Sequence, residues 1–200
     1  MSTRSDIIVH LNSGKWHRIY CHSDGYLSHN GRILFDHYTD QSHAEALVAL
    51  GDLSSLAPEI GEKHPFQSPP AYLPGGDTLR ENPEYAAFNK KYGNWCLAYG
   101  RDRGAKDCEG TIGDTIQAVW PEQDTWTEFT YVWTEGQWFV ADPDTGSQTL
   151  VNLGDALSGN ITLTPAVKAF GMILGKHAAH DPKQPTKHAW VKPRRRVAKK

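Results

Sequence analysis

The stretch TEFTYVWTEGQWFVA, residues 127–141, decides the fold. Large apolar and aromatic side chains alternate along both of its halves, and Glu135-Gly136 separates the halves. Alternation with a period of two is typical of β-strands, and an interposed residue pair ending in glycine is typical of a tight hairpin turn. We therefore predict a β-hairpin with strands at 127–134 and 137–141.

A second hairpin is predicted near the N-terminus, from strands at 7–12 and 15–22 joined at Ser13-Gly14. A two-residue turn would place His10 opposite His17. One face would then carry the apolar side chains Ile7, Val9, Leu11, Trp16 and Tyr20.

Helices are expected at 30–38, 40–50, 83–93 and 164–177. Asp40 and Asn82-Pro83 are typical of helix starts, and Gly51 of a helix end. A short strand is expected at 94–99. Between the helices, six prolines and Gly75-Gly76 predict a long loop at 57–83.

The predicted fold is therefore α+β: a single antiparallel sheet built from two hairpins, with helices on one face. Residues 1–180 would form one domain. The Lys-, Pro- and Arg-rich residues 181–200 are predicted to be a disordered basic tail.

Composition favours a cytoplasmic protein. Hydrophobic residues make up 38% of the 200 residues, enough for a core, yet no apolar run approaches the roughly 20 residues of a membrane-spanning helix. The start, MSTRSD, does not resemble a secretion signal. Three cysteines without a CxxC spacing argue against a disulfide framework and favour a reducing compartment.

Charge is distributed unevenly, although the net charge is only −2. Residues 182–200 carry eight basic residues and no acidic one, so the remainder has 13 basic and 23 acidic residues and a net charge near −10. Between Lys106 and Lys168 there are ten acidic residues and no Lys or Arg. Such a body could simply be well solvated, or it could bind a basic partner as a DNA mimic does.

Several motifs occur in order: MSTRS at the start, YCHSDGYLSHNG at 20–31, GDLSSL at 51–56 and YGRDRG at 99–104. In this respect the chain resembles a family of small proteins common in phages and prophages. The family form has Trp where this chain has Ser23, and Glu where it has Ala105. The resemblance implies a phage accessory protein in the host cytoplasm and implies no reaction, cofactor or catalytic residue.

The first motif contains the catalytic candidates Cys21, His22 and Asp24. A cysteine and a histidine can act as nucleophile and base when they lie within hydrogen-bonding distance. Neighbours on a strand point to opposite faces, however, so Cys21 would need His29, His37 or a distant base. The alternative is a capped turn in which Asp24 and Asn30 bond backbone amides.

Two other sets of side chains suggest ligands. His10 and His17 could supply two metal ligands, but no third ligand has suitable spacing, so we expect no metal and no cofactor. Arg101 and Arg103 are candidates for gripping a phosphate or carboxylate. Alternatively, these arginines pair with nearby acids and satisfy loop carbonyls.

The basic tail is a candidate for sequence-independent nucleic-acid contact by charge alone. The residues proposed for it are Lys192, Arg194, Arg195, Arg196, Lys199 and Lys200.

We therefore expect a phage accessory protein that binds a host or phage macromolecule, with no membrane partner. One alternative is a small enzyme acting on a phosphorylated or nucleotide substrate. Its arginines at 101 and 103 would hold the anion. The other alternative is a nucleic-acid-binding protein that depends on its tail.

Overall fold

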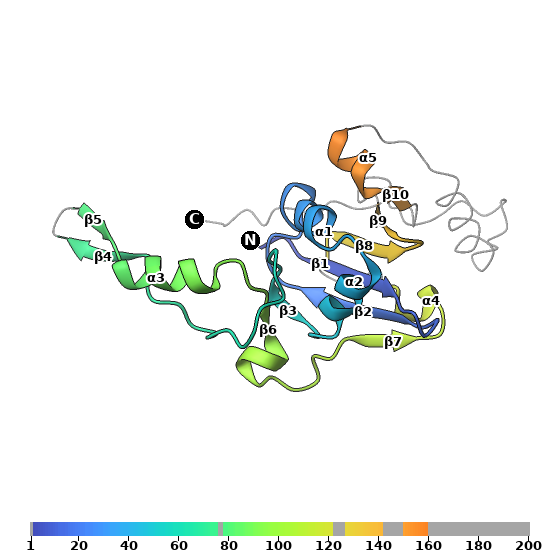
Figure 1. Cartoon of the computed structure of the whole chain (residues 1–200), viewed down its shortest axis with the longest axis horizontal. Coiled ribbons are helices and arrows are strands. Elements are labelled where there is room, and N and C mark those ends of the chain that lie inside the picture. Colours follow the sequence, from blue (N-terminus) through green and yellow to red (C-terminus); the bar gives the residue numbers. More distant parts are fainter. Residues whose placement is uncertain (1, 76–77, 122–126, 142–149, 160–200) are drawn as a thin grey trace, which may run out of the picture.

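The computed structural model describes residues 2–75, 78–121, 127–141 and 150–159 (Figure 1). The predicted helix at 164–177 and the predicted tail lie outside the described residues. The helices are α1 (Arg32–His37), α2 (Gln41–Val48), α3 (Pro83–Tyr92), α4 (Ile116–Val119) and α5 (Leu153–Ser158). Two single π-helical turns, η1 (Leu27–Gly31) and η2 (Tyr99–Arg103), complete the helical elements of the described chain.

The main sheet has eight strands, with the order β10-β9-β8-β1-β2-β3-β6 and with β7 also paired to β2. These strands are β1 (Ser5–His10), β2 (Trp16–Cys21), β3 (Leu53–Ser55), β6 (Leu97–Ala98), β7 (Thr111–Gly113), β8 (Phe129–Thr134), β9 (Gln137–Ala141) and β10 (Leu150–Asn152). A separate two-stranded sheet consists of β4 (Tyr72–Gly75) and β5 (Thr78–Glu81).

Both predicted hairpins are confirmed, but the expectation of a single antiparallel sheet is wrong. β1 runs parallel to β8, and β2 runs parallel to β3. Ile7, Ile8 and Val9 of β1 are all fully buried. A continuous buried run is typical of a central strand that is covered on both faces, and such a strand can pair in parallel with a segment far away in sequence.

Helices cover both faces of the sheet rather than the predicted one. α1, α2 and α5 pack on the face that carries Ile7 and Val9. The short helix α4 packs on the opposite face, against Ile8 and Trp16.

The register of the first hairpin differs by one residue from the prediction. His10 pairs with Trp16, and Val9 pairs with His17, because the connection spans residues 11–15 instead of two residues. A shift of one residue moves every side chain of a strand to the other face. Trp16 therefore lies on the Ile8 face, where its ring stacks on His10 with the centroids 4.4 Å apart.

The second hairpin follows the prediction. Trp133 pairs with Trp138, and Thr134 pairs with Gln137. Glu135 and Gly136 have φ values of 52° and 74°, the left-handed backbone that a two-residue hairpin turn requires.

The proline-rich segment is more structured than the expected loop, since it contains β4 and β5. It leads into α3, which begins as predicted with Asn82 accepting a hydrogen bond from the Glu84 N–H. The expected strand at 94–99 is reduced to the two residues of β6. Figure 1 shows β4, β5 and α3 extending to the left, away from the main sheet. We call residues 62–95 the arm.

Candidate functional site

The motifs that stood out in the sequence lie on three adjacent strands. YCHSDG ends β2, GDLSSL contains β3, and YGRDRG follows β6. Cys21 pairs with Leu53, which pairs in turn with Ala98. Motifs up to 80 residues apart therefore meet at one end of the sheet.

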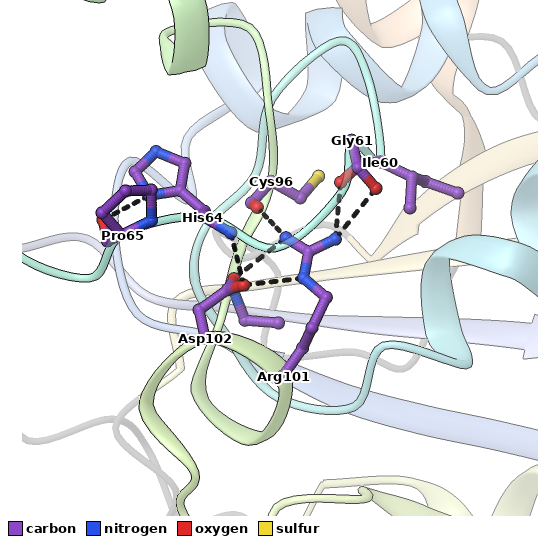
Figure 2. A network of polar contacts seen from close by, with 8 residues as sticks. Ile60, Gly61, His64, Pro65, Cys96, Arg101 and Asp102 are labelled. Carbon is purple, nitrogen blue, oxygen red and sulfur yellow. Dashed lines mark hydrogen bonds and ion pairs between the residues drawn. The ribbon is translucent and has the colours of Figure 1, made fainter. Parts of the chain in front are cut away.

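Arg101 and Asp102 form the centre of this region (Figure 2). Arg101 donates from Nε to Asp102 Oδ1 at 2.8 Å and from Nη2 to Asp102 Oδ2 at 2.9 Å. Its remaining donors reach the carbonyl oxygens of Ile60, Gly61 and Cys96. All five N–H donors of the guanidinium therefore have an acceptor.

The Asp102 side chain is fully buried and also accepts two backbone N–H groups, from His64 at 2.8 Å and from Ala98 at 2.7 Å. Burial alone would raise the pKa of this carboxyl. The Arg101 guanidinium and the two backbone donors outweigh burial and hold the pKa below its ordinary value. Asp102 is thus ionised at neutral pH.

Together these two residues clamp the base of the arm. The chain enters the arm through Ile60, Gly61 and His64, and it returns through Cys96 and Ala98. Arg101 and Asp102 bond to both segments, as Figure 2 shows. We call this pair the clamp.

His64 connects the clamp to α3. Its backbone N–H bonds Asp102, while its ring packs against Phe88 and Tyr92 with centroid distances of 5.5 and 5.2 Å. Tyr92 in turn packs against Trp95 at 5.3 Å. This aromatic cluster fixes α3 to the arm's base, although α3 buries no residue of its own.

The outer part of the arm exposes large apolar side chains. In β4, the exposed fractions of Tyr72 and Leu73 are 54% and 41%. In the described residues, β4 and β5 pair only with each other. A two-stranded hairpin is marginally stable in water on its own, so a surface of this kind gains from a partner that covers it.

The predicted anion-binding residues have different environments. Arg101 belongs to the clamp, in agreement with the alternative interpretation that the arginines pair with acids and satisfy loop carbonyls. Arg103 is exposed, and its guanidinium lies over the Phe66 ring, 5.1 Å from the centroid. Anion binding by Arg101 and Arg103 stays a prediction. Of the two, Arg103 is the arginine with donors facing solvent.

The catalytic candidates do not form one constellation. Cys21 is fully buried, and burial raises its pKa to about 12, so its thiol is neutral at neutral pH. Its Sγ accepts a hydrogen bond from Asn30 Nδ2 at 3.4 Å. His22 follows the last residue of β2, and its Nδ1 lies 2.9 Å from the Tyr20 hydroxyl rather than near Cys21. Asp24 has a φ of 55° and accepts the Asn30 N–H through its backbone carbonyl, as expected for a turn.

The histidines proposed as metal ligands are separated by the change of register. His17 Nε2 lies 2.8 Å from the Glu109 carbonyl oxygen, while His10 stacks on Trp16. Within the described ranges, no three His, Cys, Asp or Glu side chains are close enough to share a metal ion.

A buried polar cluster, missed at the level of sequence, lies on the Ile8 face. Asp6 is 3% exposed, and one of its carboxylate oxygens, Oδ2, has no hydrogen-bond partner. Arg18 Nε lies 4.0 Å from its Oδ1. Burial raises the pKa of Asp6, and the nearby carboxylate of Asp52 adds to this rise. A charged residue inside the apolar alternation of β1 was the available signal.

The predicted nucleic-acid contacts at 192–200 lie outside the described residues. None of the helices in the described chain is long and apolar enough to cross a membrane.

Comparisons with known proteins give no match. No family model matches the sequence, and neither the curated proteins nor the solved structures contain a significant match.

Proposed function

We propose that the protein acts by binding another macromolecule, and that the arm presents the binding surface. The observation that carries this proposal is the exposure of Tyr72 and Leu73 on a hairpin held away from the main sheet by the clamp. Fixing the arm in advance lowers the conformational entropy lost on binding. Tyrosine is also among the residues that contribute most to protein interfaces.

The partner that suits the arm is a protein rather than a nucleic acid. Residues 62–95 contain four acidic and four basic residues, so the arm offers no excess positive charge to a phosphate backbone. The two-stranded sheet can accept an extended segment along an edge, with apolar side chains of the partner packing on Tyr72 and Leu73.

The charge of the body favours a basic partner. Among the described residues of 107–121 and 127–135, five acidic side chains are exposed. They are Asp107, Glu109, Asp114, Glu128 and Glu135. The negative electrostatic potential of these side chains would speed association with a basic protein, while the arm would make the close contacts.

On the resemblance to phage proteins, we propose that the partner is a host or phage protein and that binding occurs in the host cytoplasm. Nucleic-acid binding by the tail is a separate proposal, supported by charge alone. Removing residues 182–200 would test it, because phosphate contacts should then be lost together with their steep salt dependence.

The arm is tested by affinity capture from bacterial lysate with nuclease present. The double variant Tyr72→Ser, Leu73→Ser is compared with the wild type and with Ile112→Ser. Ile112 is 57% exposed on β7, far from the arm, and so controls for the loss of a surface apolar residue. We expect one protein to be retained by the wild type and by Ile112→Ser but lost with the double variant.

Equal retention by all three proteins would overturn the role of the arm. Light scattering of the purified protein covers the case of self-association. A dimer that dissociates in the double variant would make a second copy the occupant and would overturn the proposal of a different partner.

A further inference from the structure

A second apolar surface lies where α1 meets α5. α5 directly follows β10 at one edge of the main sheet, whereas the arm returns to the sheet at β6, the opposite edge. α5 packs against both η1 and α1 (Figure 1). This surface is therefore separate from the arm and from the clamp.

Phe35 is the most exposed apolar side chain of this surface. It lies on α1 and is 42% exposed. Its ring packs on the backbone of Gly154 in the first turn of α5, since a Cβ at Gly154 would lie 3.0 Å from the ring atom Cε2 and 3.3 Å from Cζ. The same three elements carry further apolar side chains that are only partly buried, namely Leu27, Ile33, Ala156 and Leu157.

The charged side chains nearest to Phe35 in sequence do not oppose an apolar occupant. Arg32 and Asp36 lie on the same helix and pair with each other, with 3.2 Å between Nε and Oδ2. Their charges offset one another, so no unpaired charge of this pair would have to be buried when Phe35 is covered.

The chain leaves α5 close to this surface. α5 ends at Ser158, and Gly159 stops the helix with a φ of 75° while its N–H bonds the Ala156 carbonyl oxygen at 3.3 Å. A helix rises about 1.5 Å per residue, so Gly159 lies within about 10 Å of the Gly154 backbone that the Phe35 ring covers.

The sequence that follows contains a matching apolar stripe. Residues 164–177 are predicted to form a helix from Thr164-Pro165 onward, with Val167, Phe170, Ile173 and Leu174 on one side. From Gly159 to Thr164 an extended chain can span about 17 Å. A single helix of this length is marginally stable in water, so its stripe gains from a surface that covers it.

We propose that residues 164–177 bind as an amphipathic helix to the surface formed by Phe35 and its apolar neighbours on η1 and α5. A segment tethered this closely acts at an effective concentration on the order of mM, which favours it over a separate molecule. Its binding would also fix the point from which the basic residues 182–200 leave the body. The inference goes beyond the proposed function, because it uses no residue of the arm and takes its occupant from the same chain.

Hydroxyl-radical footprinting of the full-length protein tests this, because the oxidation of Phe35 reports on the exposure of its ring. The double variant Phe170→Ser, Ile173→Ser is compared with the wild type and with Lys168→Ser, Lys176→Ser, which changes two polar positions of the same segment. The first variant should raise the oxidation rate of Phe35 about threefold or more, since the ring would change from covered to 42% exposed. The second should leave that rate unchanged, and Tyr72 of the arm should be oxidised equally in all three proteins.

Three results would overturn the proposal. Equal oxidation of Phe35 in the wild type and in the first variant would show that the apolar stripe does not cover it. Equal increases in both variants would show that the contact does not depend on the stripe. Protection of Phe35 that grows with protein concentration would make a second copy of the chain the occupant.

A reciprocal variant keeps the proposal falsifiable if the double variant fails to fold. Phe35→Ser removes the side chain at the centre of the contact, so the oxidation rate of Phe170 should rise about threefold or more. The control is Ile112→Ser, the same kind of change at a 57%-exposed residue of β7, and it should leave Phe170 oxidation unchanged. Equal oxidation of Phe170 in the wild type, Phe35→Ser and Ile112→Ser would overturn the contact.

Discussion

Arg101 holds the carboxylate of its neighbour Asp102 through two hydrogen bonds, of 2.8 Å to Oδ1 and 2.9 Å to Oδ2. Both residues belong to the π-helical turn η2. The carboxylate then bonds the two chain segments at the base of the arm. A pair of adjacent residues thereby holds together the segments at 60–64 and 96–98, where the chain enters and leaves the arm.

Replacing Asp102 should release the arm. Asp102→Asn removes the charge opposite Arg101 and leaves a largely buried guanidinium without its counterion, which we expect to lower the free energy of unfolding by about 3 kcal/mol. Hydrogen exchange should accelerate first at His64 and Ala98, whose N–H groups bond Asp102. Urea denaturation and exchange mass spectrometry measure the two effects.

The matched control is Arg103→Ala in the same motif. Arg103 is exposed and contacts the Phe66 ring, so its loss should cost less than about 1 kcal/mol. A comparable loss of stability from both variants would contradict the structural role assigned to the clamp.

Asp6 should make the protein less stable as the pH rises. Burial raises the pKa of Asp6, so the folded state holds this proton more tightly than the unfolded state does. Stability is then lost from about pH 4, the ordinary pKa of an aspartate, up through the raised value. Asp6→Asn cannot ionise, so its free energy of unfolding relative to the wild type should increase from pH 4 to pH 7.

Urea denaturation at several pH values measures this difference. Asp114→Asn is the control, since Asp114 is 89% exposed and pairs only with the exposed Lys15 among the described residues. It should show no such increase. A difference between Asp6→Asn and the wild type that stays constant with pH would show that the Asp6 carboxyl titrates normally in the folded protein.

Local sequence patterns predicted the secondary structure where the signal itself is local. The alternation of 129–140 and the cap at Asp40 depend on residues close in sequence, although α2 ends at Val48, two residues before the predicted end at Leu50. The parallel pairing of β1 with β8 joins segments more than 100 residues apart, and no local pattern encodes it. The predicted register of the first hairpin is wrong because the connection beside Gly14 is longer than two residues.

The candidate sites were predictable in part. The YGRDRG motif was identified as a candidate site. Of its two interpretations, the one in which the arginines pair with acids and satisfy loop carbonyls describes Arg101. The partners of Arg101 could not be anticipated, since Ile60 and Gly61 contribute backbone oxygens, which any residue type has. The shift of register also explains why Tyr20 was assigned to the apolar face and its contact with His22 was missed.

Cys21 should be chemically inert in the folded protein. With a pKa of about 12, only about one thiol in ten thousand is a thiolate at pH 8, and its sulfur is fully buried. An aromatic disulfide reagent should therefore label Cys21 only after unfolding. Cys108, which is 8% exposed, should react first. Rapid labelling of Cys21 under native conditions, located by peptide mass spectrometry, would revive its candidacy as a nucleophile.

Gly51 should tolerate no side chain, because it packs directly against the backbone of Cys108 and Glu109. Its φ is +74°, and a Cβ there would lie only 2.2 Å from the Cys108 carbonyl oxygen, which accepts the Asp52 N–H. Gly51→Ala should therefore cost about 2 kcal/mol or more of unfolding free energy.

Gly14→Ala provides the control: its φ is +82°, but a Cβ there meets nothing within 4 Å, so about 1 kcal/mol of backbone strain is expected. Urea denaturation compares the two variants. Equal losses of unfolding free energy would mean that the Cys108 loop moves aside at little cost. The expected difference would show that this close contact positions Asp52, whose carboxylate accepts the Tyr20 N–H and whose carbonyl accepts the Tyr99 N–H.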